Sequence, residues 1–261
     1  MTVTPITMTL TTTTAGIPFT RHVRTELRKL TDTRAGRWLL IMIVAITLLI
    51  VVVTLFVAGP TDLTYEKFVD YTQTPQKLLL PVLGILAITS EWSQRTGLVT
   101  FTLEPRRGRV LLAKVVATLI LGVVIIALTF VCAAVGNLLG MALRGGDGSW
   151  ASVATSFRDI ALVQLTWLLQ GVAFGMVLLI SAAAIIVFYT LPNVWSGVFQ
   201  AVPALKHLAP WVDLNKAQTP LYLHDTTGSD WLRLSVATTL WVAVPLIIGT
   251  SRIRRTEVTS T

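Results

Sequence analysis

The chain has 261 residues, of which 53% are hydrophobic and only 13% are charged, and its mean hydropathy is +0.72. Globular domains carry roughly 25% charged residues, so the composition excludes an ordinary soluble domain and predicts an all-α polytopic membrane protein. The net charge of +8 does not indicate a nucleic-acid partner, because the basic residues cluster beside apolar runs, where they orient a membrane protein.

The N-terminal region divides into a tail and a helix. Residues 1–18 are rich in threonine, and we expect a disordered cytosolic tail. Residues 19–37 predict a basic amphipathic helix that lies in the membrane interface. Its apolar stripe is formed by four residues at helical spacing, Phe19, Val23, Leu27 and Leu30. The alternative interpretation is a cytosolic helix that packs on a partner.

Long apolar runs predict a six-helix transmembrane domain over residues 38–250. About 20 apolar residues are needed for a helix to cross a bilayer. The predicted spans cover about residues 38–58, 75–92, 110–139, 160–176, 181–199 and 231–249. The stretch 160–199 lacks charge and is too long for one span, so it predicts two spans with a turn between them, for which Gly171, Gly175 and Ser181 are candidates. Gly171 and Gly175 also have the GxxxG spacing that permits close helix contact.

The segments between the spans complete the predicted topology. Residues 141–159 are expected to form a loop, and the proline-rich residues 200–230 predict broken helices at the outer membrane surface. With six spans, the side that holds both termini carries 14 of the 21 basic residues and 5 of the 13 acidic residues. The positive-inside rule therefore predicts cytosolic termini, including a cytosolic tail at 251–261.

Enzymatic and ion-coupling motifs are missing from the sequence. There is no GxxxxGK[ST] phosphate loop, no HExxH or GxSxG motif and no metal-ligand spacing among the histidines. We therefore expect no catalytic residues, no metal and no cofactor on this chain. Lys114 stands near the start of the third span and is expected to snorkel to the basic side. Four uncharged polar residues within the spans are candidates for hydrogen bonds between helices or for a translocation path: Thr129, Asn137, Gln164 and Gln170.

The segment between the second and third spans, residues 91–109, is the longest polar interruption between two crossings. Its centre, Leu98–Leu103, alternates apolar residues with threonine and fits either a strand or a helix. A polar element on the basic side of a membrane suits the docking of a cytosolic partner, and the alternative is an ordinary positive-inside loop.

The segment TSEWSQRTGLVTFTLEPRRGRVLLAK resembles the signature segment of type-2 ATP-binding-cassette exporter permeases. The resemblance is carried by Glu91-Trp92 at the end of the second span, Arg95-Thr96-Gly97 after it, Pro105-Arg106-Arg107 and Lys114. The six-span layout and the amphipathic helix before the first span are similar to that family as well.

The resemblance implies a permease subunit in the bacterial plasma membrane that pairs with a second copy or a related permease. A separate cytosolic ATPase would hold the ATP and Mg²⁺, and the residues that couple to it would be Glu91, Arg95, Thr96, Gly97, Phe101 and Arg106. Phe101 supplies an apolar anchor, and the alternative for Arg106 and Arg107 is contact with lipid phosphates. The expected cargo is a hydrophobic or amphipathic drug, peptide or lipid. A non-transport scaffold and an ion-coupled carrier are the alternative functions.

Overall fold

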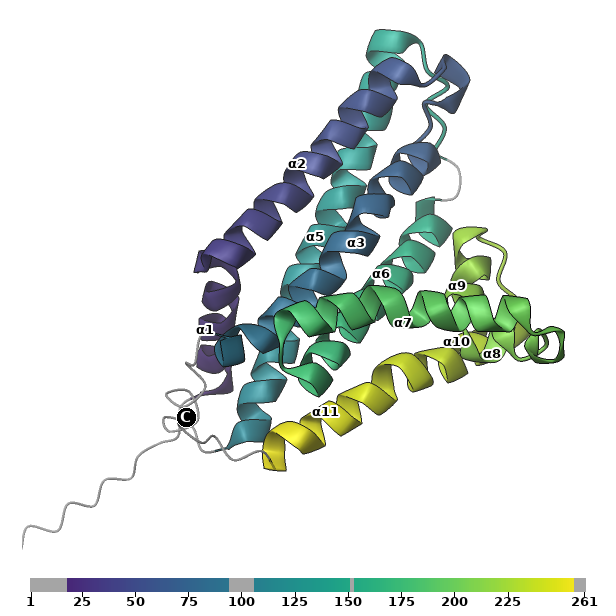
Figure 1. The fold of residues 1–261 in the computed structure, drawn as a ribbon. Coiled ribbons are helices and arrows are strands. Elements are labelled where there is room, and N and C mark those ends of the chain that lie inside the picture. The colour runs from purple at the N-terminus through teal and green to yellow at the C-terminus, as the bar shows by residue number, and fades with distance from the viewer. Residues whose placement is uncertain (1–17, 94–105, 151–152, 256–261) are drawn as a thin grey trace, which may run out of the picture.

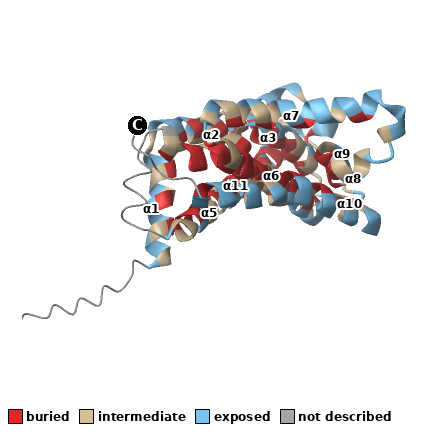
Figure 2. Cartoon of the chain, turned by 60° about the horizontal axis from the view of Figure 1, so that its bottom comes forward, coloured by how far each residue is buried: buried red, intermediate tan, exposed pale blue. Residues whose placement is uncertain are grey.

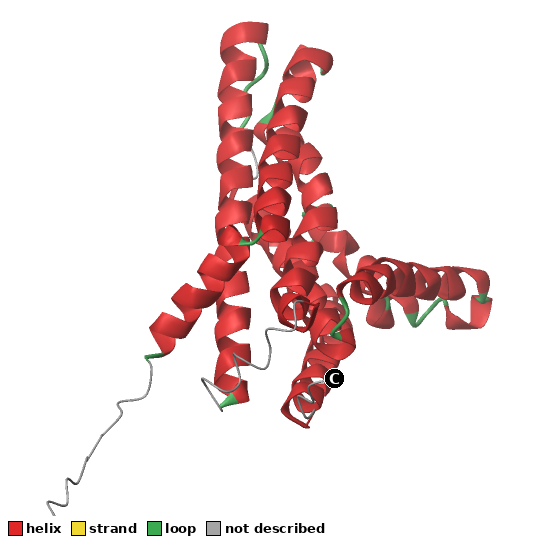
Figure 3. Ribbon diagram, turned by 60° about the vertical axis from the view of Figure 1, so that its left-hand side comes forward, coloured by secondary structure: helices red, strands yellow, loops and turns green. Residues whose placement is uncertain are grey.

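The computed structural model describes residues 18–93, 106–150 and 153–255, and all regular structure within these ranges is helical. The elements are, in chain order, α1 (Phe19–Asp32), α2 (Arg34–Val57), η1 (Pro60–Asp62), α3 (Tyr65–Ser93), α5 (Arg107–Arg144), α6 (Val153–Leu178), α7 (Ser181–Ala201), η2 (Pro203–Leu205), α8 (Ala209–Val212), α9 (Leu214–Tyr222), α10 (Gly228–Thr238), the π-helical turn η3 (Thr239–Ala243) and α11 (Val244–Arg255). Figure 3 shows the helices joined by loops and turns, drawn in green where they are described.

Five helices of the described chain are long and apolar enough to cross a membrane. They are α2, α5, α6, α7 and the continuous helix Gly228–Arg255. Large apolar side chains face outward, as Leu49, Phe56 and Ile186 do, each with 59% or more of its surface exposed. Such a surface is costly in water and is typical of helices that face lipid. The chain is therefore a multi-pass, all-α membrane protein.

Helix α3 lies at the centre of the main bundle, where it packs against α2, α5 and α6 (Figure 1). Their shared core contains Ile43, Phe68, Leu83, Ile126 and Ile160. Figure 2 shows the buried residues gathered along this axis and the exposed residues on the outside. The position of α3 explains why this helix can be less apolar than its neighbours: protein, rather than lipid, surrounds most of its surface.

Glycines bring α3 and α6 into close contact, as the GxxxG spacing predicted. A Cβ atom at Gly171 would come within 2.3 Å of the Pro81 carbonyl oxygen, and one at Gly84 within 2.6 Å of the Leu168 oxygen. Any larger side chain at either position would push the two helices apart. Gly171 is thus a packing residue, and the turn between α6 and α7 falls later, at Leu179 and Ile180, where Leu179 has a positive φ of 60°.

Several predicted boundaries are wrong. Helix α3 begins at Tyr65 and not at Pro75, and much of the predicted loop 141–159 is helical, because α5 continues to Arg144 and α6 begins at Val153. The predicted helix 19–37 is interrupted at Thr33. Polar residues in these extensions are buried and hydrogen-bonded, as Thr72 is to the Phe68 oxygen at 2.7 Å. The helices can therefore continue beyond the apolar stretches from which they were predicted.

The segment 200–230 is broken into short helices, as its prolines predicted. Asp213 caps the start of α9, since its side chain accepts a hydrogen bond from the Asn215 amide at 3.0 Å. Aromatic residues of α6, α7 and η3 form a second core around α9, including Phe174, Phe188 and Trp241. This layer lies beside the main bundle at the right of Figure 1.

Candidate functional site

Helix α1 packs its apolar stripe on its own chain. Val23 and Leu30 are buried against Ala113 and Ala117 of α5 and Ala87 of α3. The predicted amphipathic helix is present, and its arginines at 21, 24 and 28 are exposed. Contact with α3 and α5, which the sequence did not predict, uses most of the stripe that was expected to face the membrane interface.

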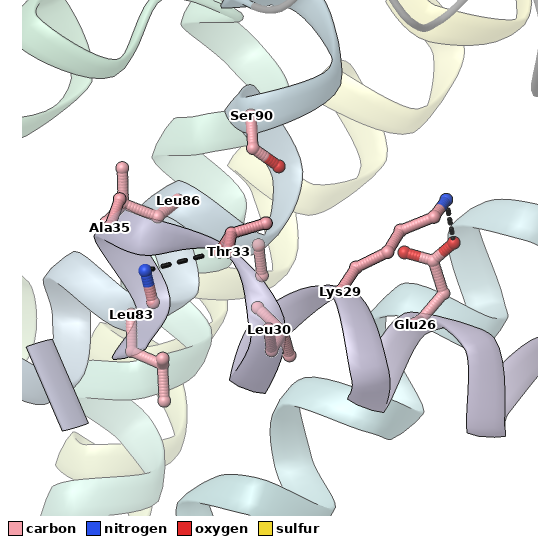
Figure 4. A pocket seen from close by; sticks show the side chains of 10 residues that line it. Glu26, Lys29, Leu30, Thr33, Ala35, Leu83, Leu86 and Ser90 are labelled. Carbon is pink, nitrogen blue, oxygen red and sulfur yellow. Dashed lines mark hydrogen bonds and ion pairs between the residues drawn. The ribbon is translucent and has the colours of Figure 1, made fainter. Parts of the chain in front are cut away.

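A sharp corner joins α1 to α2. The Thr33 hydroxyl accepts a hydrogen bond from the Gly36 amide at 3.3 Å, which caps the start of α2. A Cβ atom at Gly36 would lie 1.9 Å from the Leu30 oxygen, so the corner requires glycine. Beneath it lies a cavity of about 30 Å³, lined by residues of α1, α2 and α3 (Figure 4). Glu26 and Lys29 stand at one end of this cavity with their side chains turned toward each other.

Four charged residues from three helices form an ion-pair network, which we call the charge ring: Glu26 and Lys29 of α1, Glu91 of α3 and Lys114 of α5. The Lys29 ammonium lies 2.7 Å from one carboxylate oxygen of each glutamate. The Lys114 ammonium lies 2.6 Å from Glu26 Oε2 and 3.0 Å from Glu91 Oε1. Each lysine therefore contacts both glutamates, and the ring is electrically neutral.

The charge ring is largely shielded from solvent. The side chains of Lys114, Glu91 and Glu26 are only 2%, 4% and 8% exposed, whereas Lys29 is 39% exposed. The prediction that Lys114 snorkels is therefore wrong, because two carboxylates hold its ammonium inside the protein. Burial lowers the pKa of Lys29, but hydrogen bonds and charge attraction from Glu26 and Glu91 outweigh this effect and raise its pKa above the ordinary 10.5.

The charge ring connects α1 to both helices that flank the segment 94–105. Glu91 stands near the end of α3 and Lys114 near the start of α5. Removing one partner of a buried ion pair lowers the stability of a protein by several kcal/mol, because the other charge is left uncompensated. A displacement of any one of α1, α3 and α5 against the other two would break such contacts. The three helix ends are therefore mechanically linked.

A second junction lies beside the charge ring. Arg107, the first residue of α5, donates a hydrogen bond to the Ile253 oxygen of α11 at 3.2 Å, and Gly108 lies against the Arg254 side chain. Arg252 donates to the Val177 oxygen at the end of α6. The start of α5 and the ends of α3, α6 and α11 therefore gather with α1 at one end of the molecule (Figure 1).

Two of the predicted coupling residues lie in the described chain. Glu91 belongs to the charge ring, and Arg106 is exposed as the residue that precedes α5. Arg95, Thr96, Gly97 and Phe101 lie outside the described residues, as does the alternating stretch 98–103.

The four predicted path residues are all buried within the chain. Thr129 donates to the Ile125 oxygen at 3.0 Å and accepts a hydrogen bond from Gln76. Asn137 donates to the oxygens of Gly148 and Ser149 at 3.3 and 3.4 Å, so it holds the loop after α5. The amide groups of Gln164 and Gln170 have no hydrogen-bond partner within the described ranges.

Sequence reasoning missed the two α1 members of the charge ring. Glu26 falls on the apolar stripe, three residues after Val23 and four before Leu30. An acidic residue on such a stripe, together with a lone lysine at the start of an apolar span, is the signal that would have suggested a buried pair.

A second polar cluster, at the opposite end of α6, was also missed. Asp159 is fully buried and accepts from Arg158 Nε at 2.7 Å and from His224 Nδ1 at 3.1 Å. The Ser156 hydroxyl lies 3.3 Å from His224 Nε2. The contacts run from serine to histidine to aspartate, as they do in a catalytic triad of nucleophile, base and orienting carboxylate. Ser156 has no exposed surface, however, so a substrate cannot reach its hydroxyl in this structure. The cluster instead holds the turn after α9 against α6.

Within residues 18–93, 106–150 and 153–255, no three histidine, cysteine or acidic side chains are placed to hold a metal ion. Comparison with known proteins gave no further assignment: no protein-family model matches the chain, and no curated protein matches it.

Proposed function

We propose that this chain is the transmembrane permease subunit of an ATP-driven exporter of the ATP-binding-cassette class. In this proposal a separate cytosolic ATPase hydrolyses ATP, and the permease moves a hydrophobic or amphipathic molecule out of the cell. The observation that carries the proposal is the charge ring, which joins α1, α3 and α5 on both sides of the segment 94–105.

The charge ring supports a role for this segment in transmitting force. A docking loop can drive the helices behind it only if those helices respond together. Glu91 and Lys114 are each held by two opposite charges, and such contacts resist separation. A push on segment 94–105 would thus reach α3, α5 and α1 as one unit. An ordinary connecting loop requires no such link.

The proposed topology has six crossings, with α3 as the second. At about 1.5 Å per residue, the 29 residues of α3 extend roughly 44 Å, which exceeds the 30 Å hydrocarbon core. The exposed arginines of α1 and the basic end of α11 lie at the same end of the molecule as the flanks of segment 94–105. By the positive-inside rule this end faces the cytosol, where the ATPase would dock.

The energy source of the proposed exporter is on another chain, because this sequence has no phosphate loop. The proposed assembly holds two permeases, either identical or related, in a bacterial plasma membrane. ATP and Mg²⁺ bind to the ATPase subunits, and closure of the ATPase pair changes the access of a cavity between the permeases.

The proposal is tested by purifying the tagged chain from its native membrane in mild detergent. We expect an ATPase with a phosphate loop to copurify and its activity to rise when the permease is present. The double variant Arg95→Glu, Phe101→Ala should abolish both effects. The matched control Lys216→Glu, Trp211→Ala changes exposed residues of α8 and α9 and should leave the association unchanged.

Three outcomes would contradict the proposal. Unchanged association in the double variant would show that segment 91–109 is not the docking element. Stable association without ATP-dependent transport in reconstituted vesicles would favour a membrane scaffold, and transport driven by an ion gradient without any ATPase would favour a secondary carrier.

A further inference from the structure

Two glutamines are buried in the aromatic layer beside the main bundle. Gln170 of α6 is 1% exposed and Gln218 of α9 has no exposed surface. Gln170 follows Trp167 by three residues and precedes Phe174 by four, so it shares their face of α6. Trp167 donates its indole N–H to Gln218 Oε1 at 2.9 Å, which places the second glutamine at the same face.

Aromatic rings of α6, α7 and η3 pack against one another in the layer that contains these glutamines. Phe188 of α7 lies 5.7 Å from Trp167 and 6.0 Å from Phe174, measured between ring centroids, and Trp241 lies 6.5 Å from Phe174. The rings meet at tilted or edge-to-face angles, the arrangement that aromatic pairs favour. Four helical elements, α6, α7, α9 and η3, thus contribute to one aromatic layer.

The glutamine amides are incompletely hydrogen-bonded. Both amide atoms of Gln170 and the amide nitrogen of Gln218 have no partner in the described part of the chain. A buried polar group without a partner destabilises a protein, and native structures contain few of them. These atoms are therefore available to hydrogen-bond a ligand, since Gln170 offers both a donor and an acceptor and Gln218 offers a donor.

The helix that closes this layer is locally irregular. Residues Thr239–Ala243 form a π-helical turn, from which the Trp241 indole donates to the Val212 oxygen at 2.7 Å. Single π-helical turns occur frequently at functional sites. This observation is independent of the glutamine amides and lies in the same layer.

We propose that this layer is a binding site for a neutral aromatic molecule that carries an amide or hydroxyl group. The side chains of the site are Trp167, Gln170, Phe174, Phe188, Gln218 and Trp241. None of the six is ionisable near neutral pH, so the site selects against charged ligands. The rings contact one another in this structure, so a ligand enters when α7 or η3 shifts away from α6.

The identification of this ligand as cargo rests on the proposed export function, whereas binding itself needs no ATPase. The test therefore uses the purified chain alone and a matched pair of radiolabelled probes. Benzanilide has two aromatic rings joined by an amide, and trans-stilbene has the same outline without hydrogen-bonding groups. Equilibrium dialysis against empty detergent micelles corrects for partitioning into detergent.

We expect saturable binding of benzanilide that is at least ~10-fold tighter than that of stilbene, since a probe without an amide leaves the glutamines unpaired. Gln170→Met should remove this preference and should not lower the melting temperature, because it deletes an unpaired amide. The control Gln76→Met deletes an amide that bonds Thr129, so it should lower the melting temperature and keep the probe preference.

Equal binding of the two probes to the unaltered chain would overturn the inference. So would a lower melting temperature of Gln170→Met, since it would show that the amide already has a partner. Specific binding without ATP-driven transport of benzanilide in vesicles that contain the ATPase would remove the cargo assignment and leave the site intact.

Discussion

Lys114→Met is the sharpest perturbation of the charge ring. Methionine keeps the length and apolar stem of lysine and removes only the ammonium group. In the native chain that group lies 2.6 Å from Glu26 and 3.0 Å from Glu91 and is almost fully buried. After the substitution, Lys29 supplies the one ammonium that remains among the four positions of the ring, and these four positions carry a net negative charge.

The cost of this substitution follows from the burial of the remaining charges. Breaking a buried ion pair by removing one partner costs about 3–5 kcal/mol. Lys29→Met leaves the same two buried carboxylates with Lys114, but the Lys29 side chain is 39% exposed and water can replace the lost ammonium, so it should cost clearly less than Lys114→Met. Both variants remove one positive charge from the same ring, so their difference isolates the effect of burial.

Unfolding by SDS in mixed micelles, followed by tryptophan fluorescence, measures these losses. The exposed residue Lys216 of α9 supplies the control, and Lys216→Met should change the free energy of unfolding by less than about 0.5 kcal/mol. Adding Glu26→Gln to Lys114→Met restores neutrality, so the double variant should be no less stable than the single one. A loss below about 1 kcal/mol for Lys114→Met, or additive losses in the double variant, would refute the buried ring.

Three further predictions concern other parts of the chain. The pKa of Lys29 is raised above 10.5 in the folded chain, so its contribution to stability should be fully present below pH 10.5 and should be lost as the pH rises through the folded-state pKa. The free energies of unfolding of the native chain and of Lys29→Met should therefore converge only above that pH. Asp159→Asn should lower the free energy of unfolding by about 1–3 kcal/mol, since it weakens the bonds from its guanidinium and imidazole partners; no change on chemical unfolding would argue against the cluster. Gly171→Ala should cost about 1–3 kcal/mol, because its methyl group meets the Pro81 oxygen. Gly197→Ala, which meets nothing within 4 Å, should be neutral or stabilising, and equal effects of the two alanines would contradict the packing.

Local patterns predicted the apolar helices that are least covered by the rest of the chain. Helix α7 runs from Ser181 to Ala201 against a predicted 181–199, and α2 ends at Val57 against a predicted 58. Their apolar runs end where their helices end, since most of their surface is not covered by other parts of the chain and few neighbours extend them. The break of 200–230 into short helices was likewise predictable, because proline removes backbone hydrogen bonds.

Boundaries set by neighbouring helices could not be read from local patterns. The parts of α3 and α6 that precede the predicted spans contain polar residues that are nonetheless buried, as Thr72 and Ser156 show, and only the partners of these residues explain why they are helical. The role of a glycine could not be predicted for the same reason, because it depends on which helix lies next to it. Gly171 was a candidate turn residue and a candidate packing residue, and the contact with Pro81 decides for packing.

The charge ring depends on contacts between distant parts of the sequence. Lys29 bonds Glu91 across 62 positions, and Lys114 bonds Glu26 across 88. Hydrophobic periodicity places a residue on a helix face and does not name its partner. Glu91 was predicted to be functional through its place in the docking segment, whereas the α1 residues that hold it become visible only in the folded chain.

The central claim, that segment 91–109 is a cytosolic element, is tested most directly by labelling a cysteine in that segment. The chain has a single natural cysteine, Cys132, which is buried, so Cys132→Ala supplies a clean background for Gly97→Cys. A membrane-impermeant maleimide should label this cysteine in inside-out vesicles and leave it unlabelled in right-side-out vesicles. Labelling only in right-side-out vesicles would place the segment outside the cell and contradict the account.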